Sequence, residues 1–117
     1  MKGKDIRMAI NHTEAIIRLL DYDYDDNIYD LSYFDNGKGF SYEDTKNCRT
    51  HDERIIMLII NHLIALSEIL AEYKEKIDGM IEKIRTGNQV IDDIAGVIED
   101  LTDEITCRID DIDIPLI

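Results

Sequence analysis

Two pairs of carboxylates stand at helical spacing in this sequence, and such pairs can hold a hydrated divalent cation. Glu72 and Glu75 form the first pair, and Asp100 and Asp103 form the second. Carboxylates three residues apart lie on one face of a helix. Two such faces brought together from antiparallel helices supply the oxygen ligands that Mg²⁺ prefers. The chemistry to consider first is therefore magnesium-assisted hydrolysis.

This pattern resembles the paired acids of all-α nucleotide pyrophosphohydrolases of the MazG and dimeric dUTPase kind, in which the second pair is normally E-x-x-D. The resemblance implies a magnesium-dependent enzyme, and it is the enzymatic alternative for this chain. The hydrophobic register described below, however, places all four carboxylates on the side of their helices opposite the apolar stripe. There they face water instead of converging on a metal ion. Such pairs also arise by chance in a chain with 26 acidic residues.

A second group of acids alternates directly after the first predicted helix. Asp21, Asp23 and Asp25 have the spacing of the first half of an EF-hand calcium loop, which they resemble. The second half differs, because Asp26 replaces the glycine of the sharp turn and Ser32 replaces the bidentate glutamate. We interpret the segment as a solvated acidic loop, with weak Ca²⁺ binding as the alternative.

The three histidines are not expected to converge. His51 and Asp52 form a dipeptide similar to that of HD-type phosphohydrolases, but helix capping explains it. Arg7 and His12 match the R-x4-H pattern of HEPN ribonucleases, and His62 reads as a hydrogen-bonded core residue. No glycine-rich phosphate loop appears, and no Ser or Cys stands in a recognisable nucleophile context. We therefore assign no catalytic residue and expect binding instead of catalysis, with no cofactor.

The charge is large and unevenly distributed. The chain has 26 acidic and 13 basic residues, which gives a net charge of −13. Residues 21–45 carry eight acidic residues against one basic, and residues 88–117 carry nine against one. Such a field repels nucleic acid and anionic membranes, and attracts basic protein surfaces. We expect a basic protein partner, such as a nucleic-acid-binding enzyme, and no direct binding to nucleic acid or membrane.

One hydrophobic register runs from Ile56 to Ile112 at alternating spacings of three and four. This spacing keeps its side chains on one stripe of a helix, which must be buried against other helices. Only Gly87 and Arg108 interrupt the apolar pattern. The register comprises Ile56, Ile59, Leu63, Leu66, Leu70, Tyr73, Ile77, Met80, Ile84, Gly87, Ile91, Ile94, Ile98, Leu101, Ile105, Arg108 and Ile112.

These patterns predict a single all-α domain over residues 1–117. Helices are expected over about 5–20, 51–86 and 89–110, and an acidic, tyrosine-rich loop over 21–50, for which a small hairpin between Leu31 and Tyr42 is the alternative. Thr50 and Glu53 have capping-box spacing at the start of the second helix, and residues 55–60 should be its most buried part. Gly87 has the character of a left-handed cap, so the chain should fold back there into a long antiparallel hairpin, with Gly79 as the second choice.

The apolar faces are wider than a two-stranded coiled coil needs, which favours a small helical bundle of three or four helices. Because the chain supplies three, we expect a homo-oligomer, with a dimer favoured. Cys48 and Cys107 have neither zinc-like nor redox-like spacing, and Ile55–Leu66 is too short to span a bilayer. We expect free thiols and a cytoplasmic location.

By exclusion, the acidic outer side of the last helix is the candidate working surface. Its carboxylates recur three or four residues apart, and nearby tyrosines add contact area beside the charge. A rigid row of this kind can occupy a basic groove meant for DNA or RNA, as small acidic inhibitors of phages and mobile elements do. A structural helical oligomer is the alternative. The candidate residues are Asp92, Asp93, Glu99, Asp100, Asp103, Asp110, Tyr22, Tyr24 and Tyr29.

Overall fold

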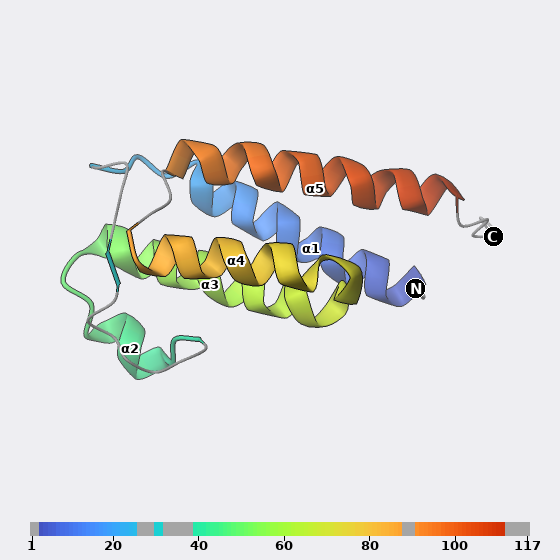
Figure 1. The fold of residues 1–117 in the computed structure, drawn as a ribbon. Coiled ribbons are helices and arrows are strands. Elements are labelled where there is room, and N and C mark those ends of the chain that lie inside the picture. Colours follow the sequence, from blue (N-terminus) through green and yellow to red (C-terminus); the bar gives the residue numbers. More distant parts are fainter. Residues whose placement is uncertain (1–2, 26–29, 32–38, 88–90, 112–117) are drawn as a thin grey trace.

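The computed structural model is a bundle of helices and describes residues 3–25, 30–31, 39–87 and 91–111 (Figure 1). The predicted all-α class is confirmed. The elements are α1 (Gly3–Leu20), α2 (Tyr42–Lys46), α3 (His51–Ile69), the 3-10 helix η1 (Ala71–Tyr73), α4 (Lys74–Arg85) and α5 (Ile91–Asp111). Four of the six are long enough to build the core.

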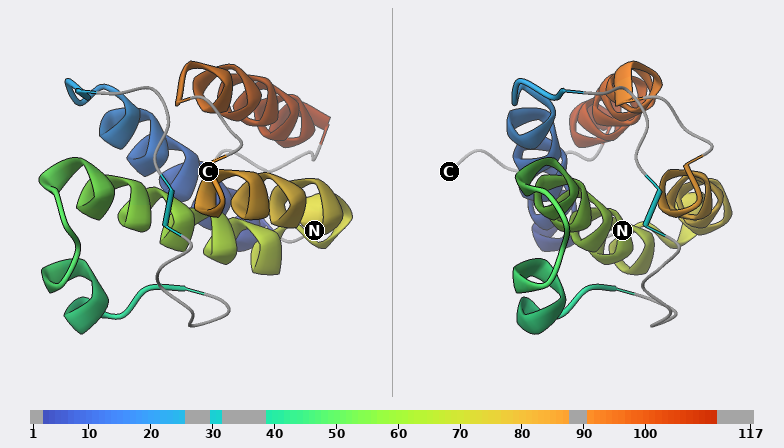
Figure 2. Two further views of the ribbon diagram at one scale, coloured as in Figure 1. Left: turned by 60° about the vertical axis from the view of Figure 1, so that its left-hand side comes forward. Right: turned by 90° about the vertical axis from the view of Figure 1, so that its left-hand side faces the viewer.

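The helix α1 packs between α3 and α5. It contacts α3 on one flank and α5 on another, while α4 packs on α3. Among the described residues, no Cα atom of α4 lies within 8 Å of a Cα atom of α5. Figure 1 shows α1 running antiparallel to both α3 and α5, and the end-on view of Figure 2 shows α5 beside α1 and α4 beside α3. The last helix is therefore attached to the bundle through α1, and not through the preceding helix as a hairpin would require.

The predicted register describes the core well. Its members in α3 and α4 are buried, as are Ile94, Ile98, Leu101 and Ile105 in α5, and they form one cluster with Ile6, Ala9 and Ile16 of α1. Residues 55–60, which we expected to be the most buried part of the second helix, are buried at every position except Leu58, which is 38% exposed.

The expected helix over 51–86 is in fact two helices. The chain leaves helical geometry at Leu70 (φ −103°, ψ 73°), passes through η1 and continues as α4. The segment Ala71–Arg85 is bent by 115° relative to α3. A straight helix of 36 residues would be about 54 Å long, longer than the 48 Å maximum extent of the molecule. The bend instead folds Ile77, Ile81 and Ile84 back into the core. Gly79, our second choice for the break, lies inside α4.

Both predicted helix-end signals are confirmed. The Thr50 hydroxyl accepts from the Glu53 N–H and the Glu53 carboxylate accepts from the Thr50 N–H, each at 3.2 Å, which forms a capping box. Gly87 follows α4 with φ 73°, a left-handed conformation that costs glycine little.

The connecting segment is fixed to the bundle at several points. Leu31 is fully buried, and its N–H donates to the Arg85 carbonyl oxygen at 2.8 Å. Asn61 of α3 clamps the backbone of Phe40: its Oδ1 accepts from the Phe40 N–H and its Nδ2 donates to the Phe40 oxygen, both at 2.9 Å. The small hairpin considered for this segment would turn within residues 32–38, outside the described residues.

No single helix in the described ranges is both long enough and apolar enough to cross a bilayer. The segment Ala71–Arg85 reaches that length and composition only together with α3, across the 115° bend.

Candidate functional site: the acidic face of the last helix

The helix α5 is strongly two-sided. Four aliphatic residues, Ile94, Ile98, Leu101 and Ile105, recur every three or four positions and are at most 2% exposed. Burying a side chain of this kind contributes about 2 kcal/mol relative to leaving it in water. The buried stripe faces α1, and it fixes which side of α5 must point outward.

The outward side is a row of carboxylates that we call the α5 acidic face. It consists of Asp93, Glu99, Asp100, Asp103 and Glu104, all exposed. Sequence reasoning had omitted Glu104, although its position four residues after Asp100 places both on one side of the helix. The side chains of Asp92 and Asp110, the other predicted members, lie outside the described residues.

Among the described side chains, none of these carboxylates takes part in an ion pair. The ion pairs in the described ranges join Arg18 to Glu14, Arg49 to Glu53 and Lys74 to Asp78, and none includes a residue of α5. The field of the face is therefore not neutralised from within the described bundle. Unpaired surface charges remain available to an incoming partner and cost no internal ion pair when they bind it.

The fold brings one residue of the acidic loop beside this face. Asp21 and Glu99 line a small hollow of about 140 Å³ between the end of α1 and the first half of α5, together with Ile17, Leu20 and Ala95. The start of the acidic loop and the last helix, which are separate in the sequence, therefore each contribute one carboxylate to this hollow. No sequence periodicity links them.

The predicted contact tyrosines differ in how exposed their side chains are. Tyr22 is 38% exposed, and its ring packs edge-on against Tyr24 and His51. Partial burial and the nearby Asp52 carboxylate raise the pKa of Tyr22 above its ordinary value. Tyr24 is half-buried and donates its hydroxyl to the Leu19 oxygen at 2.7 Å, so it serves the fold. Tyr29 lies outside the described residues.

The residues of the two metal alternatives are not brought together. Glu72 and Glu75 lie on η1 and α4, Asp100 and Asp103 lie on α5, and in the described ranges no Cα atom of η1 or α4 comes within 8 Å of one in α5. In the acidic loop Asp21, Asp23 and Asp25 are exposed, and the Asp25 N–H donates to the buried Asp52 carboxylate. Within the described residues no group of three or more His, Cys, Asp or Glu side chains is placed to hold a metal ion.

Two histidines do meet, contrary to our expectation. His12 of α1 and His62 of α3 approach with their Nδ1 atoms 2.9 Å apart, where one ring donates and the other accepts. Burial, and then the proximity of His12, lower the pKa of His62 below its ordinary value. Sequence reasoning missed this pair because the helical period of each segment does not say which helices are neighbours.

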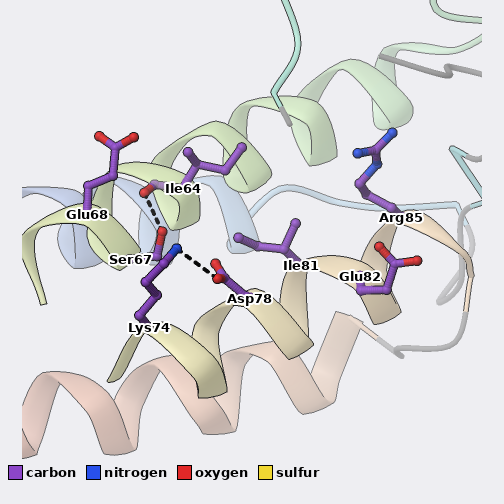
Figure 3. Close-up of a pocket in the computed structure, with 8 residues that line it drawn as sticks. All are labelled: Ile64, Ser67, Glu68, Lys74, Asp78, Ile81, Glu82 and Arg85. Atoms are coloured by element: carbon purple, nitrogen blue, oxygen red, sulfur yellow. Dashed lines mark hydrogen bonds and ion pairs between the residues drawn. The ribbon is translucent and has the colours of Figure 1, made fainter. Parts of the chain in front are cut away.

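Another hollow, with a volume of about 250 Å³, lies between α3 and α4 (Figure 3). Ile64 and Ile81 form its apolar part. The remaining lining residues have mixed charge, and Lys74 is already paired with Asp78 at 2.9 Å. Because cations and anions alternate around it, this hollow selects no one charge type of ligand.

Comparison with known proteins adds no assignment: no family model, curated protein or solved structure matches the chain. Function must therefore be argued from the surface itself.

Proposed function

We propose that the protein is a non-enzymatic interaction module whose α5 acidic face binds a basic surface of a partner protein. The observation that carries this proposal is the exposed row of Asp93, Glu99, Asp100, Asp103 and Glu104, none of which is paired with a cation of the described bundle. A rigid helix holds the row, so binding costs little backbone ordering.

The charge density of α5 suggests what kind of basic surface it fits. Its 21 residues span about 31 Å and include eight acidic residues and one basic residue. This leaves one net negative charge per ~4.5 Å of axis, compared with one per ~3.4 Å for a single nucleic-acid strand and one per ~1.7 Å for duplex DNA. The charge density along α5 is therefore closer to that of a single nucleic-acid strand than to that of a duplex. We infer that its partner is a protein with a basic groove for single-stranded nucleic acid, which α5 blocks by mimicry.

The test compares two variants of equal charge. The face variant carries Asp93→Lys, Glu99→Lys, Asp100→Lys and Asp103→Lys. The control variant carries Glu43→Lys, Glu68→Lys, Glu75→Lys and Glu82→Lys, at exposed positions of α2, α3 and α4. Both change the net charge by the same eight units, from −13 to about −5.

Each protein is immobilised and used to capture proteins from an extract of the native host, followed by mass spectrometry. We expect basic proteins bound by the native chain and by the control variant to be lost from the face variant. Equal losses from both variants would mean that only overall charge matters. Retention by both would refute a role for the α5 acidic face.

A further inference from the structure

A second surface, on the opposite side of α1 from the α5 hollow, has a very different character. We call it the α1–α3 outer face, and it consists of Met8, His12 and Ala15 of α1 with Leu58, His62 and Ala65 of α3. Both helices place a large apolar residue, a histidine and an alanine at the same spacing of four and three. Such spacing puts each trio on one side of its helix.

This face is apolar and accessible. Met8 is 41% exposed and Leu58 is 38% exposed, which places them among the few large hydrophobic side chains that the described bundle leaves in water. The four remaining members are half-buried. The hydrogen bond between His12 and His62 joins the two helices at the middle of the face. In the end-on view of Figure 2, α1 and α3 lie side by side and α4 and α5 lie to their other sides.

The charge pattern argues for a second copy of this chain as the occupant. The chain carries a net charge of −13, so two copies repel each other over most of their surfaces. The α1–α3 outer face itself contains no carboxylate, and the charged residues one turn beyond it are Arg18 and Arg54 at one end and Asp5 and Glu68 at the other. A basic partner is drawn toward the α5 acidic face, whereas a second acidic copy can approach closely only where carboxylates are absent.

The face is also complementary to itself. An isologous dimer needs a patch that fits its own rotated image. Because α1 and α3 run antiparallel, Met8 lies beside Ala65 at one end of the face and Leu58 lies beside Ala15 at the other, with the two histidines between them. A two-fold axis that passes through the His12–His62 pair, in the plane between the two copies, places Met8 and Leu58 opposite alanines of the other copy. This holds whether the axis lies along the helices or across them. Each large side chain then meets a small one, as close packing requires.

We propose that the α1–α3 outer face is a homodimer contact. Each trio covers about 11 Å of helix, and two helices about 10 Å wide present a patch of roughly 220 Å² per copy, which is well below the ~600 Å² per partner of small stable interfaces, so the contact is weak. The dimer is therefore concentration-dependent. It leaves the α5 acidic face free, so the proposal is independent of the proposed function.

The test is sedimentation equilibrium of the full chain from about 10 μM to about 1 mM at physiological salt, a range suited to a weak interface. Leu58→Lys and Met8→Lys place an ammonium group in the contact of each copy. Ile17→Lys is the matched control, because Ile17 is 39% exposed but faces the hollow beside α5. Circular dichroism confirms that each variant is folded.

We expect the native chain and Ile17→Lys to dimerise with similar constants. Each variant on the face should weaken association at least about tenfold, since a buried unpaired charge is costly and the two-fold axis doubles it. A native chain that stays monomeric throughout overturns the proposal. So does a dimer that tolerates both Leu58→Lys and Met8→Lys, or one that Ile17→Lys disrupts equally.

Discussion

The replacement Asn61→Ala tests how the connecting segment is held. Asn61 makes two hydrogen bonds of 2.9 Å to the backbone of Phe40, whose side chain is 7% exposed. Gly39 permits this close approach, because a Cβ there would lie 2.9 Å from Asn61 Oδ1. The Asn61 side chain thus pairs with both the N–H and the carbonyl oxygen of Phe40, as a neighbouring strand does in a sheet. Alanine has no polar side-chain atom that could replace these hydrogen bonds.

The expected magnitude follows from two opposing effects. Each lost hydrogen bond costs about 1 kcal/mol net, so the pair costs about 2 kcal/mol. Alanine is a better helix former than asparagine by about 0.5 kcal/mol, which offsets part of the loss. The free energy of unfolding should therefore fall by about 1.5 kcal/mol, and Tm by roughly 6 °C for a domain of this size.

Urea unfolding and thermal melts followed by circular dichroism measure this effect, and hydrogen exchange at the Phe40 amide locates it. The matched control is Asn11→Ala, at an exposed position of α1 with no hydrogen bond to its side chain in the described structure. The control gains helix propensity only and should be slightly stabilised. If Asn61→Ala is as stable as Asn11→Ala and the Phe40 amide exchanges at the native rate, the clamp does not hold the segment.

Three further predictions concern stability. The pKa of His62 is lower in the folded state than in the unfolded chain, so the unfolded chain binds more protons near pH 6. The contribution of neutral His62 to the free energy of unfolding is therefore fully present above pH ~6.5, the ordinary histidine pKa, and is lost as pH falls through the folded-state pKa. The stability difference between the native chain and His62→Gln, measured in urea, should shrink from pH 7.5 to 5.5, and a constant difference would contradict this reasoning. Gly87→Ala should destabilise by about 1 kcal/mol in the same assay because φ is 73° there, and an unchanged midpoint would show that the left-handed cap is not required. Conversely, Gly79→Ala and Gly96→Ala, whose added Cβ atoms meet nothing within 4 Å, should each raise stability by up to about 1 kcal/mol, and a loss would indicate a hidden contact.

The sequence predicted the core because burial follows the helical period. The register members Ile59, Leu63, Ile94 and Ile98 are all buried, and the caps at Thr50 and Gly87 depend on neighbours within four residues. The break at Leu70 could not be predicted in this way. No glycine or proline marks it, and it results from the packing of α4 on α3, a tertiary interaction that overrides local propensity.

The surfaces, like the core, were predictable where they depend on one helix and unpredictable where they depend on two. The outward direction of Asp93, Asp100 and Asp103 followed from the buried stripe on their own helix. The contact of His12 with His62, and the placement of Asp21 and Glu99 around one hollow, depend on which helices are neighbours. Periodicity gives each helix a buried side and an exposed side but not its partner, so the order α5–α1–α3–α4 required the structure.

The central claim is that the α5 acidic face, and not the total charge, binds a basic partner. The most direct measurement is calorimetric titration of a captured partner with the native chain, the face variant and the control variant over a range of salt concentrations. We expect the face variant to bind at least about 100-fold more weakly, the control to bind within a few-fold of native, and single-stranded nucleic acid to compete with the native chain. Equal affinities for the face and control variants would contradict the account.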